Sequence, residues 1–395
     1  MQKSRLRRVG AVILGASLLV AACGDDEEAA TETTAATETT AASESTEPSG
    51  EGVVCDGIKL AFLGALSGDN GALGTNMVNG AMVAIDAFNE ANPDCQIALE
   101  EFDSQGDPAQ ATPLADNIVN DAAIIGLIGP GFSGESKATM PKFEEAGLPM
   151  ITPGATNAAL STNGWKMFHR ILANDDKQAP GVVKLISETI GGTKVGVIDD
   201  ASEYGKGLAD SVRSGLGEAN VANAQIDPKA ADYSAAIETM KAAGVDTVFY
   251  GGYYAEAAKL VQQMRDAGVE ATFVAGDGVL DMAFVDNAGP AAEGAYLTAT
   301  GAPADVNAEF QAAFNEKYGT DPALYSPEAY DCAQVFLQGI AAGNVTREAL
   351  AAWVESYDAE GITKQIKFDE TGEPEGDAVY YYVVESGAIV AKGLI

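Results

Sequence analysis

The part of the sequence best suited to binding chemistry is a glycine-rich loop that carries one serine. Residues 129–134 read GPGFSG and lie between an apolar run at residues 124–128 and a helical stretch that starts near Glu135. Free backbone N–H groups at a helix start, together with a hydroxyl such as that of Ser133, can hold an anion. An ordinary helix N-cap explains the same residues, so this loop alone leaves both interpretations open.

The chain is poor in the residues that hydrolytic and metal-dependent enzymes use. Its single histidine, His169, excludes most Ser-His and Cys-His pairs and all His-rich zinc sites. His169 lies in a short apolar stretch, where we expect a structural role. Residues 64–68 follow the first apolar run without the GxGxxG order of a dinucleotide loop, and GxxxxGK[ST] is absent. We therefore expect a protein that is not an enzyme, with no catalytic residue, no metal and no cofactor.

Charge and length limit the class of protein further. Lys plus Arg number 23 against 58 Asp plus Glu, and the resulting net charge of -35 repels phosphate backbones. Nucleic acid is excluded as a partner. A chain of 395 residues with 47% hydrophobic content is typical of a globular protein with more than one core, so we expect two lobes.

Short apolar runs alternate with helical stretches along most of the chain. The runs lie at residues 58–63, 97–102, 124–128, 150–152, 195–198 and 245–250. The helical stretches lie at residues 75–89, 107–121, 135–146, 177–190, 203–219, 233–243, 255–267, 306–318, 327–342 and 347–357. This order predicts parallel α/β sheets, closed by hairpin-type strands at 366–368, 379–384 and 389–390. Ligands of such sheets bind beyond the carboxyl ends of the strands.

The N-terminus has the features of an export signal. Four basic residues precede an apolar run at residues 9–22, which is too short to span a membrane as a mature helix. Residues 20–23 read VAAC and resemble the bacterial lipobox, which implies cleavage before Cys23 and lipidation of that cysteine. A plain secretory signal with an incidental cysteine is the alternative. We expect a protein anchored by lipid to the outer face of the bacterial cell membrane.

An acidic tether is expected after Cys23. Residues 24–52 contain no Lys or Arg, and the hexamer TETTAA occurs twice in succession from residue 31. Such a segment cannot bury apolar surface and should not fold. Without the signal peptide (residues 1–22) and the tether (23–52), the remaining chain carries 19 basic and 49 acidic side chains.

Three cysteines remain for the folded part. Cys55 and Cys95 each precede an apolar run, and these runs are expected to form neighbouring parallel strands. We predict a disulfide between them, in keeping with an exported protein. Cys332 lies in a mostly apolar helical run and is expected to be a buried small hydrophobe.

Four further loop segments complete a resemblance to a known family. They are residues 150–156 (MITPGAT), 203–207 (EYGKG), 250–253 (YGGY) and 276–278 (GDG). With residues 129–134 they look like the successive binding loops of the branched-chain amino acid (Leu/Ile/Val) binding proteins of ABC importers. The similarity covers about residues 58–390, in order and with similar spacing.

The resemblance implies a fold and a division into lobes. The family has the type I periplasmic binding protein fold, in which two α/β lobes, each a parallel Rossmann-like sheet flanked by helices, close over a ligand. Three hinge crossovers join the lobes, and the family pattern places them near residues 172, 301 and 373. The expected N-terminal lobe is residues 53–172 and 302–372, and the expected C-terminal lobe is residues 173–301 and 373–395.

The resemblance also assigns the carboxylate of an amino acid ligand. It would lie against the Ser133 hydroxyl, the backbone and hydroxyl of Thr156, and the region of Gly154 and Ala155. Charge-assisted hydrogen bonds at a helix start suit a carboxylate. Thr156 has an ordinary alternative role as a helix N-cap.

The opposite end of the ligand is assigned to the second lobe. Asp277 would hold the α-ammonium group, with contacts from Tyr204 and Tyr253, and Tyr325 would line the side-chain pocket. A simple turn at Asp277 and hinge packing by the two tyrosines remain alternatives. The sequence departs from the family at Asp277, where members carry a longer acid, and at Leu73, where they carry an aromatic. Leu73 leaves room for a larger ligand.

The resulting hypothesis is a monomeric binding protein that captures an aliphatic amino acid and delivers it to ABC permease subunits. One alternative is a binder of amides, urea or aromatic acids with the same fold, for which Asp277 would have no cationic partner. Another is a sensor subunit that presents its ligand to a membrane receptor. A lipoprotein enzyme on a similar scaffold is the third, and it lacks an identifiable base and nucleophile.

Overall fold

A computed structural model describes residues 55–376 and 378–395 of the chain. The predicted signal peptide, the lipidation site Cys23 and the tether lie outside the described residues. Within the described residues, no helix combines the length and the apolar character that crossing a membrane requires.

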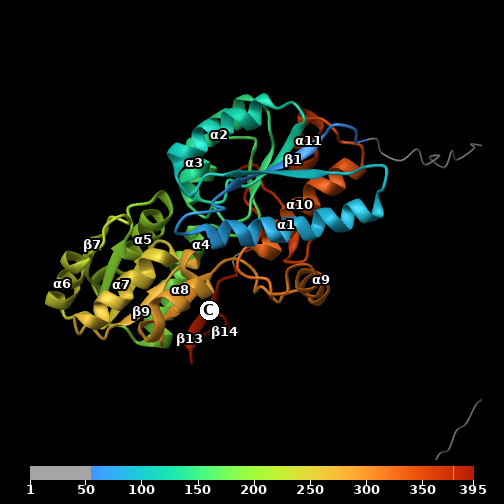
Figure 1. Ribbon diagram of the computed structural model, residues 1–395. Helices are drawn as coiled ribbons and strands as arrows, with labels where there is room; N and C mark the ends of the chain where they lie inside the picture. Colours follow the sequence, from blue (N-terminus) through green and yellow to red (C-terminus); the bar gives the residue numbers. More distant parts are fainter. Residues whose placement is uncertain (1–54, 377) are drawn as a thin grey trace, which may run out of the picture. The chain divides into compact units, whose positions relative to one another are not determined.

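We call first lobe the elements around a five-stranded parallel sheet (Figure 1). Its strands are β1 (Lys59–Gly64), β2 (Ala98–Asp103), β3 (Ile124–Ile128), β4 (Met150–Thr152) and β5 (Phe168–Arg170). Its helices are α1 (Gly71–Ala91), α2 (Pro108–Asn120), α3 (Ser133–Glu145), α9 (Ala308–Tyr318), α10 (Ser326–Ala341) and α11 (Arg347–Glu355). A 3-10 turn, η1 (Ala158–Asn163), and a small hairpin of β11 (Asp358–Glu360) and β12 (Gln365–Lys367) complete it.

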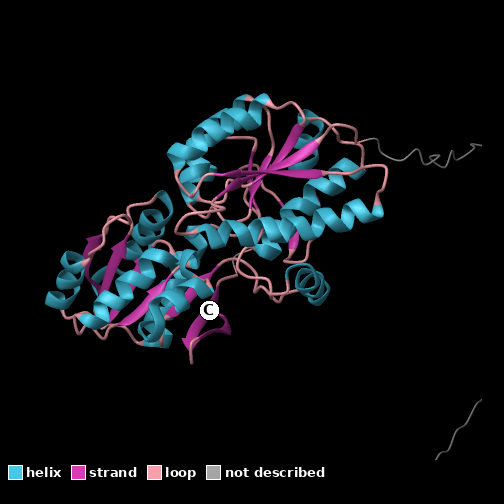
Figure 2. Cartoon of the chain, in the orientation of Figure 1, coloured by secondary structure: helices cyan, strands magenta, loops and turns pink. Residues whose placement is uncertain are grey.

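We call second lobe the elements around a seven-stranded sheet. Its strands are β6 (Val195–Asp199), β7 (Asn220–Gln225), β8 (Thr247–Gly251), β9 (Thr272–Ala275), β10 (Tyr296–Ala299), β13 (Tyr380–Glu385) and β14 (Ala388–Leu394). Its helices are α4 (Asp175–Lys184), α5 (Glu203–Leu216), α6 (Ser234–Ala243), α7 (Tyr254–Asp266) and α8 (Met282–Ala288). A π-helix, η2 (Leu185–Ile190), continues α4. Three short 3-10 helices are η3 (Gly217–Ala219), η4 (Asp277–Val279) and η5 (Gly289–Ala292). Figure 2 shows helices on both sides of the strands.

The two sheets repeat one topology. The strand order is β2-β1-β3-β4-β5 in the first lobe and β7-β6-β8-β9-β10 in the parallel part of the second. The antiparallel strands β13 and β14 extend the second sheet beyond β10. Each sheet therefore has a topological switch point, between β1 and β3 and between β6 and β8. Loops at the carboxyl ends of these strands are where such a fold places ligands.

The chain passes between the two groups of elements three times. It leaves the first lobe after β5 and enters α4, returns after β10 to α9, and leaves again after β12 for β13. The last passage runs beside β5, because the Arg170 N–H donates to the Gly372 carbonyl at 3.0 Å. A Cβ on Gly372 would lie 1.9 Å from the Phe168 carbonyl oxygen, so only glycine allows this approach.

Close helix packing explains a second glycine of the first lobe. Helices α1 and α10 lie side by side, and a Cβ on Gly80 would lie 2.0 Å from the Ser326 carbonyl oxygen. The Ser326 hydroxyl donates to the Asn76 carbonyl across the same contact, at 3.0 Å. This contact fixes the start of α10, where Tyr325 adopts a left-handed conformation with φ of 70°.

The sequence predicted the fully buried strands better than the others. Residues 124–128 and 150–152 are strands at the predicted positions, because continuous apolar runs mark strands that are covered on both faces. The prediction missed β5, β7, β9, β10 and α8. Strand β7 alternates between exposed and buried residues at the edge of its sheet, and β9 and β10 have four residues each, so none gives a long apolar run.

The cysteines lie in two different surroundings. Cys55 and Cys95 form a disulfide with their Cα atoms 4.8 Å apart, directly before β1 and β2, which pair in parallel. Cys332 is a free cysteine that is fully buried in α10, as the apolar run predicted.

Candidate functional site

The predicted site residues come together from loops at the carboxyl ends of the strands. Ser133 begins α3 after β3, Thr156 follows β4, and Asp277 follows β9 in the other sheet. All three side chains are buried. The two sheets thus contribute polar groups to one region between the lobes.

Asp277 is the centre of this region. Its carboxylate accepts hydrogen bonds from the hydroxyl of Tyr204, at 2.8 Å, and from the hydroxyl of Tyr325. Tyr204 belongs to the second lobe and Tyr325 to the first, so the Tyr325 bond joins the lobes through the carboxylate. The Gly278 N–H donates to the Tyr204 hydroxyl oxygen at 3.0 Å. Burial raises the pKa of Asp277, while the hydrogen bonds from Tyr325 and Tyr204 oppose that shift.

A second buried carboxylate, Asp175, lies near Asp277 and was missed in the sequence. Burial, and then the charge of Asp277, raise its pKa well above the usual range. Among the described residues neither oxygen of Asp175 has a hydrogen-bond partner of normal geometry. The Thr156 hydroxyl lies close enough to lower the Asp175 pKa, yet its oxygen also lacks a well-formed partner. The charge of Arg170 offsets part of this shift. Two buried carboxylates close to one another favour the binding of a further positive group.

Gln178, on the next turn of α4, is another residue that sequence reasoning missed. Its Nε2 donates to the Thr298 carbonyl and hydroxyl oxygens, both at 3.1 Å, and it also lowers the pKa of Asp277. The signal that could have found this pair is their position, because Asp175 and Gln178 open the first helix after the fifth strand. In the sequence, residues 174–176 (NDD) look like a helix cap, and Asn174 does cap Asp176 N–H at 3.0 Å.

The first-lobe loop expected to bind a carboxylate is rigidly held. The Thr152 hydroxyl accepts from the N–H groups of Gly154, at 3.3 Å, and Ala155, at 3.0 Å. The predicted donors Gly154 and Ala155 therefore already have a partner in the protein. The Ser133 hydroxyl oxygen accepts from the Asn157 N–H at 3.2 Å, and its own proton is left to donate elsewhere.

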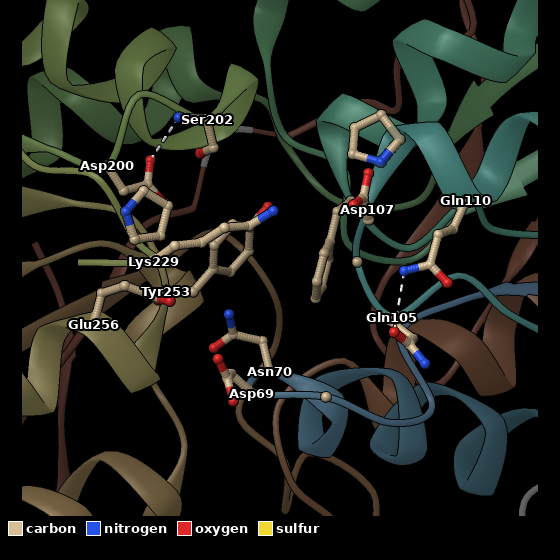
Figure 3. Close-up of a pocket in the computed structure, with 15 residues that line it drawn as sticks. Asp69, Asn70, Gln105, Asp107, Gln110, Asp200, Ser202, Lys229, Tyr253 and Glu256 are labelled. Carbon is tan, nitrogen blue, oxygen red and sulfur yellow. Dashed lines mark hydrogen bonds between the residues drawn. The ribbon is translucent and has the colours of Figure 1, made fainter. Parts of the chain in front are cut away.

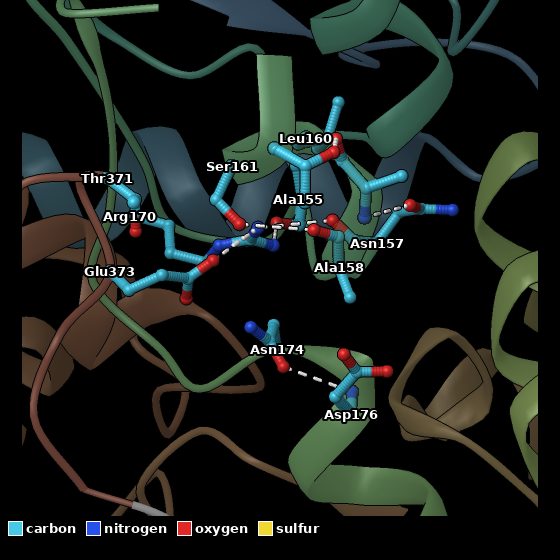
Figure 4. A network of polar contacts seen from close by, with 12 residues as sticks. Ala155, Asn157, Ala158, Leu160, Ser161, Arg170, Asn174, Asp176, Thr371 and Glu373 are labelled. Carbon is cyan, nitrogen blue, oxygen red and sulfur yellow. Dashed lines mark hydrogen bonds and ion pairs between the residues drawn. The ribbon is translucent and has the colours of Figure 1, made fainter. Parts of the chain in front are cut away.

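Arg170 supports this loop, and Figure 4 shows its side chain pointing toward Ala155 and Asn157. Its fully buried guanidinium donates to the carbonyls of Ala155, at 2.8 Å, and Asn157, at 3.1 Å. It also forms an ion pair of 2.8 Å with Glu373, on the third passage between the lobes. Arg170 thus connects the loop with a segment near the hinge.

Aromatic rings cover the side of the region that faces the strand ends β3 and β8. The rings of Phe132 and Tyr253 have centroids 4.6 Å apart, and those of Tyr253 and Tyr204 are 5.2 Å apart. Leu73 is fully buried on α1. Tyr204 and Tyr253 therefore form one cluster with Phe132, a residue that the sequence had not indicated as part of the site.

Other polar contacts also join the lobes at this edge. Lys137 of α3 forms an ion pair of 2.8 Å with Glu203 of α5, and the Asn157 side chain donates to the Glu203 carbonyl at 2.6 Å. On the far side of the region, Asn76 of α1 donates to Asp281 at 3.1 Å. The structure therefore represents an arrangement in which the two lobes touch.

His169 lies in β5, directly before Arg170, and takes no part in the lobe contacts described above. It is buried, its ring lies 4.9 Å from that of Phe368, and burial lowers its pKa to about 4. A neutral core histidine matches the structural role expected for it. In the described part of the chain no group of three or more His, Cys, Asp or Glu side chains is arranged to hold a metal ion.

Comparisons with known proteins agree on one family. A family described as "Periplasmic binding protein" matches residues 57–388. The leucine-specific-binding protein of Salmonella typhimurium is 35% identical over 63% of this chain and 68% of its own length. The leucine-, isoleucine-, valine-, threonine-, and alanine-binding protein of Pseudomonas aeruginosa is 30% identical over 81% of this chain and 88% of its own.

A solved structure gives the same result. The branched-chain amino acid transporter substrate-binding protein of Streptococcus pneumoniae, in complex with isoleucine, superimposes with a TM-score of 0.79 at 28% identity. The superposition covers 86% of this chain and 99% of that one.

Proposed function

This chain belongs to the periplasmic binding protein family, and we propose that it is the lipid-anchored substrate-binding component of an ABC importer, which captures an aliphatic α-amino acid. The ligand would be held between the lobes and passed to the permease subunits without chemical change. The observation that carries the proposal is the buried, lobe-bridging carboxylate of Asp277, with the unpartnered carboxylate of Asp175 beside it.

The two acids account for the ammonium end of the ligand. An α-ammonium group has three N–H donors, which match the carboxylates of Asp175 and Asp277 and the ring face of a tyrosine. Burying the cation between them would offset the cost of the two desolvated charges. A urea or simple carboxylate ligand brings no such charge, so these acids favour an amino acid.

The first lobe accounts for the carboxylate end. The hydroxyls of Ser133 and Thr156 supply donors, and Ser133 stands at the start of α3, where the helix dipole favours an anion. Because Gly154 and Ala155 N–H groups already donate to Thr152, their part is to shape the loop. A Cβ on Gly154 would lie 2.9 Å from the Gly131 carbonyl oxygen and 2.4 Å from Met77, so glycine is needed there.

An apolar lining accounts for an aliphatic side chain. Leu73 and Met77 of α1 are fully buried, and Tyr325 lies near Gly154 in the same part of the first lobe. The names of the relatives, which bind leucine, isoleucine and valine, support a ligand of this type.

Closure of the lobes would report ligand binding. Residues 53–172 with 302–372, and residues 173–301 with 373–395, would move as two bodies about the three passages. Because both lobes contribute ligand contacts, the ligand favours the closed arrangement, which the permease would recognise. Cleavage before Cys23, lipidation of that cysteine and the acidic tether would keep this monomeric protein at the outer face of the membrane.

Calorimetric titration of the full chain tests the proposal. Any carried-over ligand is first removed by partial unfolding and refolding, and the protein is titrated with leucine, isoleucine, valine, alanine, phenylalanine, glutamate, urea and acetamide. We expect micromolar or tighter binding of an aliphatic amino acid. The variant Asp277→Asn should weaken this binding at least about 100-fold, because it removes the charge that faces the ammonium group.

Asp286→Asn is the matched control, since Asp286 is an exposed acid of the same lobe. It should bind as the parent protein does. Tight binding of urea or of an aromatic acid that is unchanged in Asp277→Asn would refute the amino acid assignment.

A further inference from the structure

A pocket of about 470 Å³ opens between the lobes beside the aromatic cluster (Figure 3). Loops after β1, β2 and β3 form its first-lobe wall, and loops after β6, β7 and β8 form its second-lobe wall. Four of these strands, β1, β3, β6 and β8, flank the two topological switch points. We call this space the outer pocket. Of the residues that the sequence assigned to ligand binding, Tyr253 is the one that lines it.

Aromatic rings separate the outer pocket from Asp277. Phe132 and Tyr253 both line the pocket, and their rings pack against one another in a tilted arrangement. Tyr204, which donates to Asp277, packs against Tyr253. The order Phe132, Tyr253, Tyr204, Asp277 therefore leads from the pocket to the buried polar groups around Asp277, and Asp277 itself does not line the pocket.

Acidic side chains dominate the wall of the outer pocket. Its lining includes four acids, Asp69, Asp107, Asp200 and Glu256, against one cation, Lys229. The lining amides of Asn70, Gln105 and Gln110 add further oxygen acceptors. Asp107 caps α2 through the Ala109 N–H, whereas Asp200 and Glu256 stand at the second-lobe switch point.

Glu256 shows that this wall is more than a solvated acidic surface. The residue is only 5% exposed, and although Asn70 lies close enough to lower the pKa of the carboxyl, Oε2 has no well-formed hydrogen-bond partner among the described residues. Burial, and then the charges of Asp200 and Glu256, raise the pKa of Tyr250. Its hydroxyl also has no hydrogen-bond partner among the described residues. Burial raises the pKa of Glu256 to about 7 and that of Asp200 to about 6. A cation in the pocket would stabilise both charged forms.

We propose that the outer pocket is a second binding site, which takes the ammonium group of an alkylamine. Three N–H donors of such a group match Glu256 Oε2, the Asp200 carboxylate and an amide oxygen. The aromatic rings of Phe132 and Tyr253 favour an adjacent cation and its methylene groups. Because both lobes line the pocket, its occupant stabilises the closed arrangement. The proposal does not depend on leucine binding at Asp277.

The ammonium group has two possible sources. It belongs either to a free amine or to the far end of a longer amino acid whose α-ammonium group lies at Asp277. Putrescine represents the first source and lysine the second. Butanediol, which has hydroxyls in place of the two ammonium groups of putrescine, is the neutral control.

Calorimetry on the full chain, at physiological ionic strength to screen its net negative charge, tests the site. We expect putrescine or lysine to bind, butanediol not to bind, and Glu256→Gln to weaken the amine about tenfold or more. Asp200→Asn should weaken it in the same direction, which guards against a folding defect in one variant. Asp266→Asn removes the same charge from an exposed position at the other end of α7 and should leave the affinity unchanged.

The variant Asp277→Asn distinguishes the two sources of the ammonium group. Binding of putrescine that depends on Glu256 but not on Asp277 identifies a free amine, and binding of lysine that needs both acids identifies one extended ligand. The site is refuted if neither amine binds at millimolar concentration, if butanediol binds equally well, or if Asp266→Asn weakens binding as much as Glu256→Gln. A leucine titration of each variant reports separately on the site at Asp277.

Discussion

The rings of Phe132 and Tyr253 pack against each other with their centroids 4.6 Å apart, although one residue follows β3 of the first lobe and the other follows β8 of the second. The pair stands between the buried carboxylate of Asp277 and the acidic outer pocket. A contact of this kind exists only when the lobes touch. It is therefore part of the equilibrium between open and closed arrangements and not of the core of either lobe.

Removing this contact should weaken ligand binding without unfolding either lobe. An aromatic pair contributes about 0.5–1.5 kcal/mol beyond its buried area, so Phe132→Ala should reduce affinity by roughly 2- to 12-fold. Small-angle scattering should show a more open ligand-free protein. The control is Trp165→Ala, which removes a ring pair within the first lobe and should leave affinity unchanged. Equal affinities for Phe132→Ala and the parent would show that the pair does not bias closure.

Arg170 should matter to stability more than any surface cation. Arg170→Met leaves the carbonyls of Ala155 and Asn157 and the carboxylate of Glu373 without their donor. We expect a loss of about 3–5 kcal/mol in the free energy of unfolding, measured by urea titration. The double variant Arg170→Met with Glu373→Gln should lose less stability, because the unpaired carboxylate of Glu373 is then absent. Equal losses in the single and double variants would contradict a coupled pair.

The ligand-free protein should become more stable as pH falls from about 8 to 6. Burial raises the pKa of Glu135, Glu256 and Glu328 to about 7 and that of Asp200 to about 6. Since their pKa values are higher in the folded than in the unfolded chain, the folded state binds more protons in this window, and the gain is on the order of 4 kcal/mol. His169 opposes this trend below about pH 6.5, because the unfolded chain then binds a proton that the folded chain, with a pKa of about 4 at His169, does not bind.

Urea unfolding at three pH values measures this dependence. Glu328→Gln is the matched variant, because its amide oxygen can still accept from the Ala302 N–H while the titrating group is removed. Its stability should change less with pH than that of the parent. A parent protein that loses stability between pH 8 and 6 would contradict the prediction.

The disulfide between Cys55 and Cys95 should stabilise the first lobe. It closes a loop with a sequence separation of 40, which corresponds to roughly 4 kcal/mol of lost unfolded-state entropy in the chain-entropy model. Replacing both cysteines with serine should lower the melting temperature by several degrees. Replacing Cys332, which is free, with alanine controls for the loss of a buried thiol. Identical melting with and without a reducing agent would show that the bond contributes nothing.

Much of the fold and part of the candidate site could be predicted from the sequence. The family and the two-lobed type I α/β fold are confirmed. Several of the glycine-rich loops could be placed because they follow a recognisable apolar run, although residues 276–278 follow β9, which the prediction missed. The roles given to Ser133, Thr156 and Asp277 stay predictions, although the structure brings all three to the strand ends between the lobes. Asp175 was missed because it looks like part of a helix cap, and its function depends on a neighbour about 100 positions away in the chain.

Local patterns determined which residues form strands, which loops follow them and how much negative charge the chain carries, because periodicity and composition are properties of neighbours in the chain. Only the tertiary structure decided that Asp175 approaches Asp277, that Phe132 meets Tyr253 and that one carboxylate oxygen of Glu256 is buried without a well-formed partner. Each of these depends on how loops from two sheets meet when the lobes touch. The way these loops meet sets how far each charge is desolvated and paired. The spacing of residues along the chain does not encode that arrangement directly.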